Sequence, residues 1–348
     1  MRTKSSSSSF SALSSSDDTD EEVSSSWTLV RSPSPPVIST AGGLSLTDLR
    51  LFHHWSTSTF STLLVTNFPD TNDVLQRQAP SLAFQNEFLM HGLLGTASLH
   101  MQHLFPDSEQ FQKRTYVYRA KAFSSFRQSL NCVVPNSDSY DAALLMSVLL
   151  VVLCSQDYLT GENDIVTIHW IALYGGLCAI IDMKYPPGVS DTSISPILRR
   201  KLSEVEMTPV VPTVLLNMMR LVGPTDPDYS GLQSYCSLLD QLGILYASLC
   251  QDGLGPDLFL RIITFCTCPS EEFIIYARER RPRALVILSY YLSFLKLVTG
   301  VWWVEGIADK DIETIARTID PKWLALMKIP LQVNKLTDRQ EIAKLLLS

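Results

Sequence analysis

Residues 142–154 read AALLMSVLLVVLC, an apolar run interrupted by a single serine. The run is too short to cross a bilayer, because a transmembrane helix needs about 20 residues. A helix that is apolar on nearly every side is instead buried among other helices. The sequence therefore predicts an all-α protein whose core contains this helix.

A second apolar stretch, residues 284–303, is long enough for a membrane span but contains Lys296. A charge near the middle of a span costs about 2.5 kcal/mol or more. The leucines at positions 285, 288, 292 and 295 recur at intervals of three and four residues, which is typical of the buried face of a core helix. We therefore expect a second core helix here and no membrane span.

Helical spacing of apolar residues continues through most of the chain after residue 43. Leu49 and Phe52 belong to a first helix, and a second helix is expected from about Pro80 toward His103. Because no repeat period is present, we expect an irregular helical bundle and not a solenoid. Further helices are expected at residues 116–130, 165–183, 210–221, 231–251, 256–266, 270–281, 309–319 and 337–347. The last of them begins with a capping-box pattern, Thr337 and Gln340.

The first 43 residues differ in composition from the rest. They are rich in serine and carry an acidic run at residues 17–22, so they cannot bury enough apolar surface to offset chain entropy. We expect a disordered tail over 1–43 and a single large helical domain over 44–348. Trp27 and Val30 in the tail have the spacing of a short motif that anchors in a partner, or of a disordered activation segment. A solvated linker with a stray tryptophan is the simpler interpretation.

Composition and charge restrict the class of protein. The chain has 348 residues, 46% of them apolar, and a net charge of −7. A broad grip on nucleic acid needs clustered basic residues, so we expect no direct contact with DNA. Seven cysteines, an odd number, indicate reduced thiols in the cytosol or nucleus. Most of them lie in apolar helical patterns and are expected in the core.

Motifs of catalysis and of metal binding are missing. The sequence has no phosphate loop, no G-x-G-x-x-G, no H-E-x-x-H and no G-x-S-x-G. His91, His100 and His103 share one predicted helix without a carboxylate or cysteine at ligand spacing, so a structural role is favoured over a metal site. Cys266 and Cys268 are a weak metal signal for the same reason. We expect no enzyme, no metal and no cofactor.

Basic residues cluster once, at Arg278, Arg280, Arg281 and Arg283. The cluster could be a nuclear import patch or a phosphate-binding corner. We favour a charged helix terminus, because cations near a helix C-terminus interact well with its dipole and Pro282 can open the next helix.

Several segments together resemble the helical C-terminal regulatory domain of fungal binuclear zinc-cluster transcription factors, of the sterol uptake control type. They are the opening residues Leu46, Leu49, His54 and Trp55, the tripeptide LAF at 82–84, LLGTASLH at 93–100, Tyr116 and Ala120, and ALVILSYYLSFLKLVTGVWWVEG at 284–306. The resemblance covers most of residues 44–330. The six-cysteine zinc cluster with which that family usually begins is not found in this sequence.

The resemblance implies an all-helical domain that dimerises and, in sterol-responsive members, holds a lipid in an apolar pocket. The side chains of Met218, Met219, Trp302 and Trp303 could line such a pocket here. They would equally fill a solid core, because protein interiors normally pack without large voids.

The function expected from these features is regulation of transcription in the nucleus, with shuttling to the cytoplasm. The target genes would belong to sterol, lipid or secondary metabolism, and control would act through an apolar, sterol-like ligand or through a dimer partner, either a second copy or a zinc-cluster relative. Two alternatives stay open: a small-molecule binding protein that does not contact DNA, and an accessory enzyme of a metabolite pathway.

Overall fold

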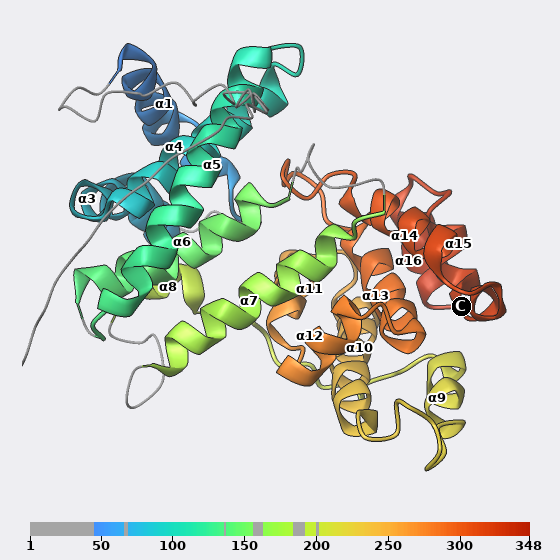
Figure 1. Cartoon of the computed structure of the whole chain (residues 1–348). Helices are drawn as coiled ribbons and strands as arrows, with labels where there is room; N and C mark the ends of the chain where they lie inside the picture. The colour runs from blue at the N-terminus through green and yellow to red at the C-terminus, as the bar shows by residue number, and fades with distance from the viewer. Residues whose placement is uncertain (1–44, 66–68, 136, 156–162, 184–191, 200–201) are drawn as a thin grey trace, which may run out of the picture. The chain divides into compact units, whose positions relative to one another are not determined.

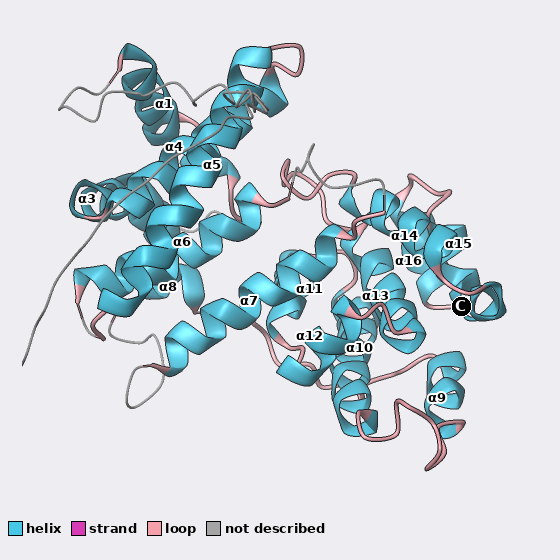
Figure 2. Cartoon of the chain, in the orientation of Figure 1, coloured by secondary structure: helices cyan, strands magenta, loops and turns pink. Residues whose placement is uncertain are grey.

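The computed structural model describes residues 45–65, 69–135, 137–155, 163–183, 192–199 and 202–348 (Figure 1). Every regular element among them is helical, which confirms the all-α prediction (Figure 2). The segment from Leu44 to Ser348 forms one compact unit. Trp27 and Val30, the candidate partner motif, lie outside the described residues. None of the described helices is both long enough and apolar enough to cross a membrane.

In the first half of the unit, the described residues form eight α-helices. They are α1 (Leu46–Thr57), α2 (Pro69–Asp73), α3 (Ala79–Gln85), α4 (Glu87–Leu104), α5 (Glu109–Ser129), α6 (Asp138–Leu153), α7 (Val166–Asp182) and α8 (Ser195–Leu198). Short turns of 3-10 or π helix join some of them: η1 (Thr59–Thr62), η2 (Val74–Gln78) and η3 (Leu130–Cys132).

The second half contains the remaining helices. They are α9 (Thr213–Arg220), α10 (Leu232–Asp252), α11 (Pro256–Thr264), α12 (Glu271–Arg278), α13 (Pro282–Leu295), α14 (Ile307–Thr318), α15 (Lys328–Val333) and α16 (Arg339–Leu346), with 3-10 turns η4 (Phe265–Thr267) and η5 (Pro321–Met327). Prolines open α11 and α13, as the fixed φ of proline allows at a first helical position.

Several helix boundaries differ from those predicted; α5, for example, begins at Glu109 and not near residue 116. Two of the differences have a local cause. The helix expected from Pro80 toward His103 is divided at Asn86, which is extended at φ −130° and ψ 99° and whose amide donates to the carbonyl of Leu82 at 2.9 Å. That local bond competes with the helix, as asparagine often does. The capping box expected at Thr337 is also wrong: Asp338 caps α16 and accepts from the N–H groups of Gln340 and Glu341 at 2.7 and 2.9 Å.

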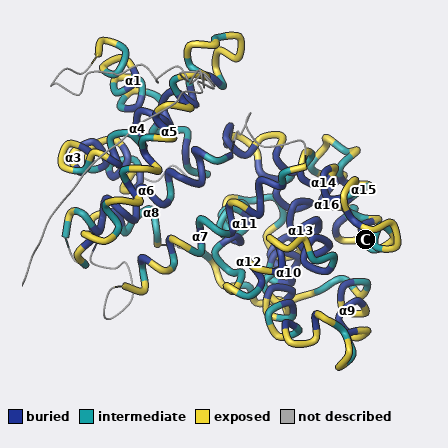
Figure 3. Tube along the Cα trace, viewed as in Figure 1, coloured by how far each residue is buried: buried dark blue, intermediate teal, exposed yellow. Residues whose placement is uncertain are grey.

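The core is built around α6 and α13 (Figure 3). In α6, 13 of 16 residues are buried, and in α13 every residue after Pro282 is buried. Helix α4 packs against both α5 and α6. It does so through Gly92 and Gly95, where an added Cβ would stand 2.6 Å from the sulfur of Met146 and 3.2 Å from Leu153. Small residues at these two positions allow the close approach of the helices.

The basic cluster anchors a loop. Arg278 ends α12, but Arg281 and Arg283 reach the loop before α10 and pair with Asp226 and Asp228. Arg283 is bidentate across the two acids, at 2.7 Å to Asp226 and 2.6 Å to Asp228. Paired charges of this kind satisfy one another when they are withdrawn from water.

Most of the cysteines are not in the core, contrary to expectation. Cys266 alone is buried, whereas Cys132 and Cys250 are exposed and the others are intermediate. Position within an apolar segment did not predict burial of these cysteines. Cys132 ends the short η3 turn, and Cys250 lies on the exposed face of α10. None of the seven, all of which the structure describes, forms a disulfide.

The start of α7 is capped by a residue from far along the chain. Its own N-cap, Ile165, has no side chain that can accept a hydrogen bond. Asp311 of α14, fully buried, accepts instead from the N–H of Val166 at 2.9 Å, and from the N–H and hydroxyl of Thr167 at 2.8 and 2.7 Å. Burial raises the pKa of the Asp311 carboxyl to about 6, so it is ionised at neutral pH. Its negative charge also interacts favourably with the positive end of the α7 dipole.

We expect Asp311→Asn to destabilise the protein by about 2 kcal/mol at pH 7.5, because the amide offers one acceptor oxygen and an N–H group that opposes the donors of α7. Urea unfolding followed by circular dichroism measures the change. Glu313→Gln, at an exposed position of the same helix, is the control and should stay within about 0.5 kcal/mol of the wild type. Equal stability of the two variants would contradict the capping role.

Candidate ligand cavity

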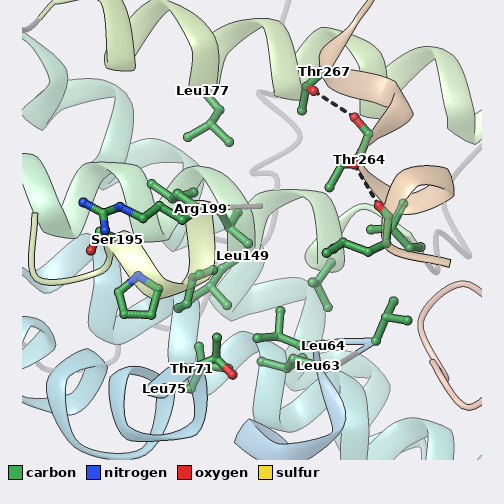
Figure 4. Close-up of a pocket in the computed structure, with 18 of the residues that line it drawn as sticks. Leu63, Leu64, Thr71, Leu75, Leu149, Leu177, Ser195, Arg199, Thr264 and Thr267 are labelled. Atoms are coloured by element: carbon green, nitrogen blue, oxygen red, sulfur yellow. Dashed lines mark hydrogen bonds between the residues drawn. The ribbon is translucent and has the colours of Figure 1, made fainter. Parts of the chain in front are cut away.

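A cavity of about 500 Å³ lies between helices of the first half of the unit and α11 (Figure 4). Its size is within the range of about 300–1,000 Å³ that small-molecule sites occupy. The walls come from residues 63–65, 69–71 and 75, from α6, α7, α8 and α11, and from Trp303. Most of the lining side chains are apolar, so the cavity suits an apolar molecule.

Helix periodicity explains how the walls form. Helix α7 contributes Tyr174, Leu177, Cys178 and Ile181, which lie at i, i+3, i+4 and i+7 and therefore on one face. Helix α6 contributes Val148, Leu149 and Val152, and α11 contributes Leu260, Ile263 and Thr264. Each helix thus turns an apolar stripe toward the same space.

Trp303 fixes one part of the cavity wall. This residue is buried, and its indole N–H donates to the carbonyl of Leu63 at 2.9 Å. Its ring meets the ring of Trp170 edge to face, with centroids 5.5 Å apart. Because Trp303 and Leu63 both line the cavity, this bond between segments 240 residues apart holds two of its walls together.

Charge enters the lining only at the rim, among the residues that the structure describes. Asp70 and Arg199 are both exposed and stand beside α2 and α8, which pack against each other. Thr264 and Thr267 of the lining are half-buried, and their hydroxyls donate to main-chain carbonyls at 2.7 and 2.8 Å (Figure 4). This distribution of polar groups suits a ligand whose larger part is apolar and lies inside the cavity, with a polar group near the mouth.

The four residues predicted to form a pocket are only partly together. Trp303 lines the cavity. Trp302, its neighbour, is buried and donates its indole N–H to the hydroxyl of Thr62 at 3.0 Å. Met218 and Met219 lie on α9 and are buried in the core, outside the cavity lining.

The histidines form a cluster behind Trp302. Nδ1 of His100 is 3.2 Å from the hydroxyl of Thr59 and 3.2 Å from Nε2 of His54. The imidazole of His100 stacks on Trp302 with centroids 5.0 Å apart, and His103 contacts the same indole at 5.5 Å. Burial, with a smaller effect of the neighbouring His54 and His103, lowers the pKa of His100 to about 4. No group of three potential ligands is arranged to hold a metal in the described part of the chain.

Sequence reasoning missed most of the lining. Leu149, Leu177 and Ile263 have the same apolar character and spacing as core residues, so periodicity alone cannot assign them to a cavity. The one-turn helix α8 has no periodic signal at all. Val148 is half-buried on a helix that is otherwise almost entirely buried, and only coordinates reveal such an opening.

The family model and the individual proteins that resemble this chain point to the same kind of protein. Residues 50–203 match the family described as fungal specific transcription factor domain. A zinc-cluster, Zn(2)-C6 fungal-type transcription factor of Gibberella zeae is 23% identical over 322 residues, which cover 84% of this chain and 62% of that protein. Sterol uptake control protein 2 of Saccharomyces cerevisiae is 25% identical over 78% of this chain and 30% of its own length. Its namesake in Candida albicans is 23% identical over 76% and 39%.

The resemblance inferred from the sequence is thereby confirmed. The chain spans less than two thirds of the length of these three relatives.

We expect the histidine cluster to make the protein sensitive to acid. Because the folded-state pKa of His100 lies below the ordinary value of 6.5, its contribution to stability is present above pH 6.5 and is lost as the pH falls toward 4. In urea titrations between pH 7.5 and 5, His100→Gln should lose less stability than the wild type. His169→Gln, at an exposed position on α7, should keep the pH dependence of the wild type. A parallel loss in His100→Gln would contradict this assignment.

Proposed function

Because residues 50–203 resemble the fungal specific transcription factor domain, we propose that this protein regulates transcription. The relatives described as zinc-cluster transcription factors support this proposal. We infer a non-catalytic role, since a transcription factor domain acts through binding. The nucleus is the proposed place of action, with shuttling to the cytoplasm.

The apolar cavity is the observation that carries the mechanism. A regulatory domain with an internal site of about 500 Å³ can bind a ligand that favours one of its conformations, and such differential binding shifts the population. Two of the relatives are named for the control of sterol uptake. We therefore propose a sterol-like or other largely apolar ligand, and target genes of sterol, lipid or secondary metabolism.

Contact with promoters is proposed to be indirect. The net charge of −7 disfavours a direct grip on DNA by this chain. A second copy of the chain or a zinc-cluster relative is the proposed partner at the promoter. Met218, Met219 and Trp302, which the sequence suggested for the ligand site, are proposed to support the fold around the cavity, and Trp303 to contact the ligand.

A small-molecule binding protein without a role at promoters is the second candidate. The cavity supports it equally well, because an apolar site of this size serves a carrier as readily as a regulator. The two differ in location and in the response of the transcriptome.

Chromatin occupancy of the tagged protein, expressed from its own locus, distinguishes the two functions. We expect promoter-centred signal and a coherent set of altered transcripts in a deletion strain. A cytosolic protein whose deletion leaves the transcriptome unchanged would overturn the regulatory role and favour the carrier.

A large side chain introduced into the cavity should weaken ligand binding and so change the transcriptional response. Ile263 is half-buried on the cavity side of α11, so Ile263→Trp adds bulk where the lining is open. We expect at least a tenfold loss of affinity for the fluorescent sterol dehydroergosterol and a change in the transcripts that the deletion alters. Val148→Trp on α6 should reproduce the effect. Leu216→Trp, exposed on α9, is the control, and equal binding by all three variants would contradict the proposed site.

A further inference from the structure

We propose that two copies of this chain pair through the outer face of α5, with the two α5 helices antiparallel and centred on position 118. The proposal rests on the second copy inferred above as a partner, and it adds the surface and the register of the pairing. Neither the sequence motifs nor the family resemblance assigns a role to this face.

Helix α5 is held to the domain along one side. It packs mainly on α4, and Tyr118 donates its hydroxyl to the carboxylate of Asp48 on α1. The buried residues of α5 are Thr115, Tyr118, Ala122 and Phe126. The other side of the helix is therefore presented to solvent by a helix that the domain already holds in place.

A second set of residues on α5 keeps a heptad spacing, although it faces solvent. These residues follow one another at intervals of four and three, which places them in one stripe along the helix. The α5 stripe consists of Glu109, Lys113, Tyr116, Ala120, Phe123 and Arg127, and all six are exposed. Heptad spacing of this kind is typical of a face that packs against another helix.

The middle of the α5 stripe is apolar, and its ends are charged. Tyr116 is 55% exposed and Phe123 is 36% exposed, with Ala120 between them. Tyr116 and Ala120 belong to the pattern that resembles the family, yet packing inside the domain does not account for them, because both are exposed. Apolar surface bordered by charged residues is typical of contacts between proteins.

The charges of the stripe decide how a second copy lies. In a parallel pair about a two-fold axis, Glu109 would meet Glu109 of the second copy and Arg127 would meet Arg127, so like charges would face each other. In an antiparallel pair centred on position 118, Glu109 of each copy lies opposite Arg127 of the other. The two-fold axis repeats this contact, so the dimer contains two pairs of opposite charges.

The other layers of the antiparallel pair also match. Tyr116 lies opposite Ala120 of the second copy, so a large side chain meets a small one. Lys113 lies opposite Phe123 of the second copy, where its aliphatic stem and ammonium group can pack on the ring. Moving the register by one layer in either direction removes both pairs of Glu109 with Arg127. The charges therefore select one register.

We expect the pairing to be weak and dependent on concentration. One helix from each copy gives a small interface beside the roughly 1,600 Å² that stable complexes bury. Exposed ion pairs also contribute little individually. A weak pairing suits a regulator, because binding sites that hold two copies close together raise their effective concentration.

Sedimentation of the full chain over a range of concentrations measures the pairing. We expect a monomer–dimer equilibrium in the wild type and at least a tenfold weaker dimer in Ala120→Arg, which places a charge in the apolar middle of the stripe. Gln128→Arg is the matched control, because Gln128 is exposed on the same helix but lies outside the stripe. It should dimerise as the wild type does, and the melting curves of both variants should match that of the wild type.

Charge reversal tests the register. Glu109→Arg and Arg127→Glu should each weaken the dimer about threefold or more, because each places like charges opposite one another twice. An equimolar mixture of the two variants should regain the affinity of the wild type, since every arginine then faces a glutamate. In a parallel pair, each single variant would exchange one pair of like charges for another and leave the affinity unchanged.

A wild-type chain that stays monomeric at every concentration would overturn the interface, as would a dimer that Ala120→Arg leaves intact. Single reversals without effect, or a mixture no tighter than its components, would overturn the antiparallel register.

The role in transcription is measured separately, by chromatin occupancy of the wild type and of Ala120→Arg. A protein that dimerises through α5 but is absent from promoters would keep the interface and overturn the regulatory role. Promoter signal from a wild-type chain that is monomeric would do the reverse. Loss of promoter signal in a folded, monomeric Ala120→Arg would support both.

Discussion

Two adjacent indole groups fasten the late part of the chain to its early part. Trp302 and Trp303 donate to Thr62 and to the carbonyl of Leu63 at 3.0 and 2.9 Å. A buried indole N–H requires an acceptor, so these bonds fix the position of the turn at η1 relative to the segment after α13. The part of the cavity wall that Leu63 and Trp303 form, and the stacked His100, both depend on that position.

The cavity is an open space beside two closely packed helices. Helices α6 and α13 are buried on nearly every side, as a closely packed interior requires. An apolar space of about 500 Å³ beside them forfeits the dispersion contacts that its lining would make in a filled core. A ligand that restores those contacts stabilises the domain in proportion to its occupancy, which connects binding to conformation.

The spacing of apolar residues was enough to predict the core helices. The contacts between residues far apart in the sequence came only from the structure. The runs around Leu149 and Leu288 are apolar enough to be placed in the core, and α7 and α10 begin and end within a residue or two of the predicted ranges. Apolar side chains show the same sequence pattern whether they face a void or a neighbour, so the lining of the cavity other than Trp303 could not be predicted. Asn86 and Asp338 form local bonds that simple helix patterns do not weigh, and Asp311 acts across 145 residues.

The long reach of Asp311 also bears on biosynthesis. Helix α7 is complete when its own residues have left the ribosome, but its first turn has no acceptor until α14 follows. Domains usually fold as units while the chain is still being made, and partly folded chains expose apolar surface that aggregates. During that interval the nascent polypeptide is a natural client for chaperones, and a product that stops before α14 would be recognised and degraded by quality control.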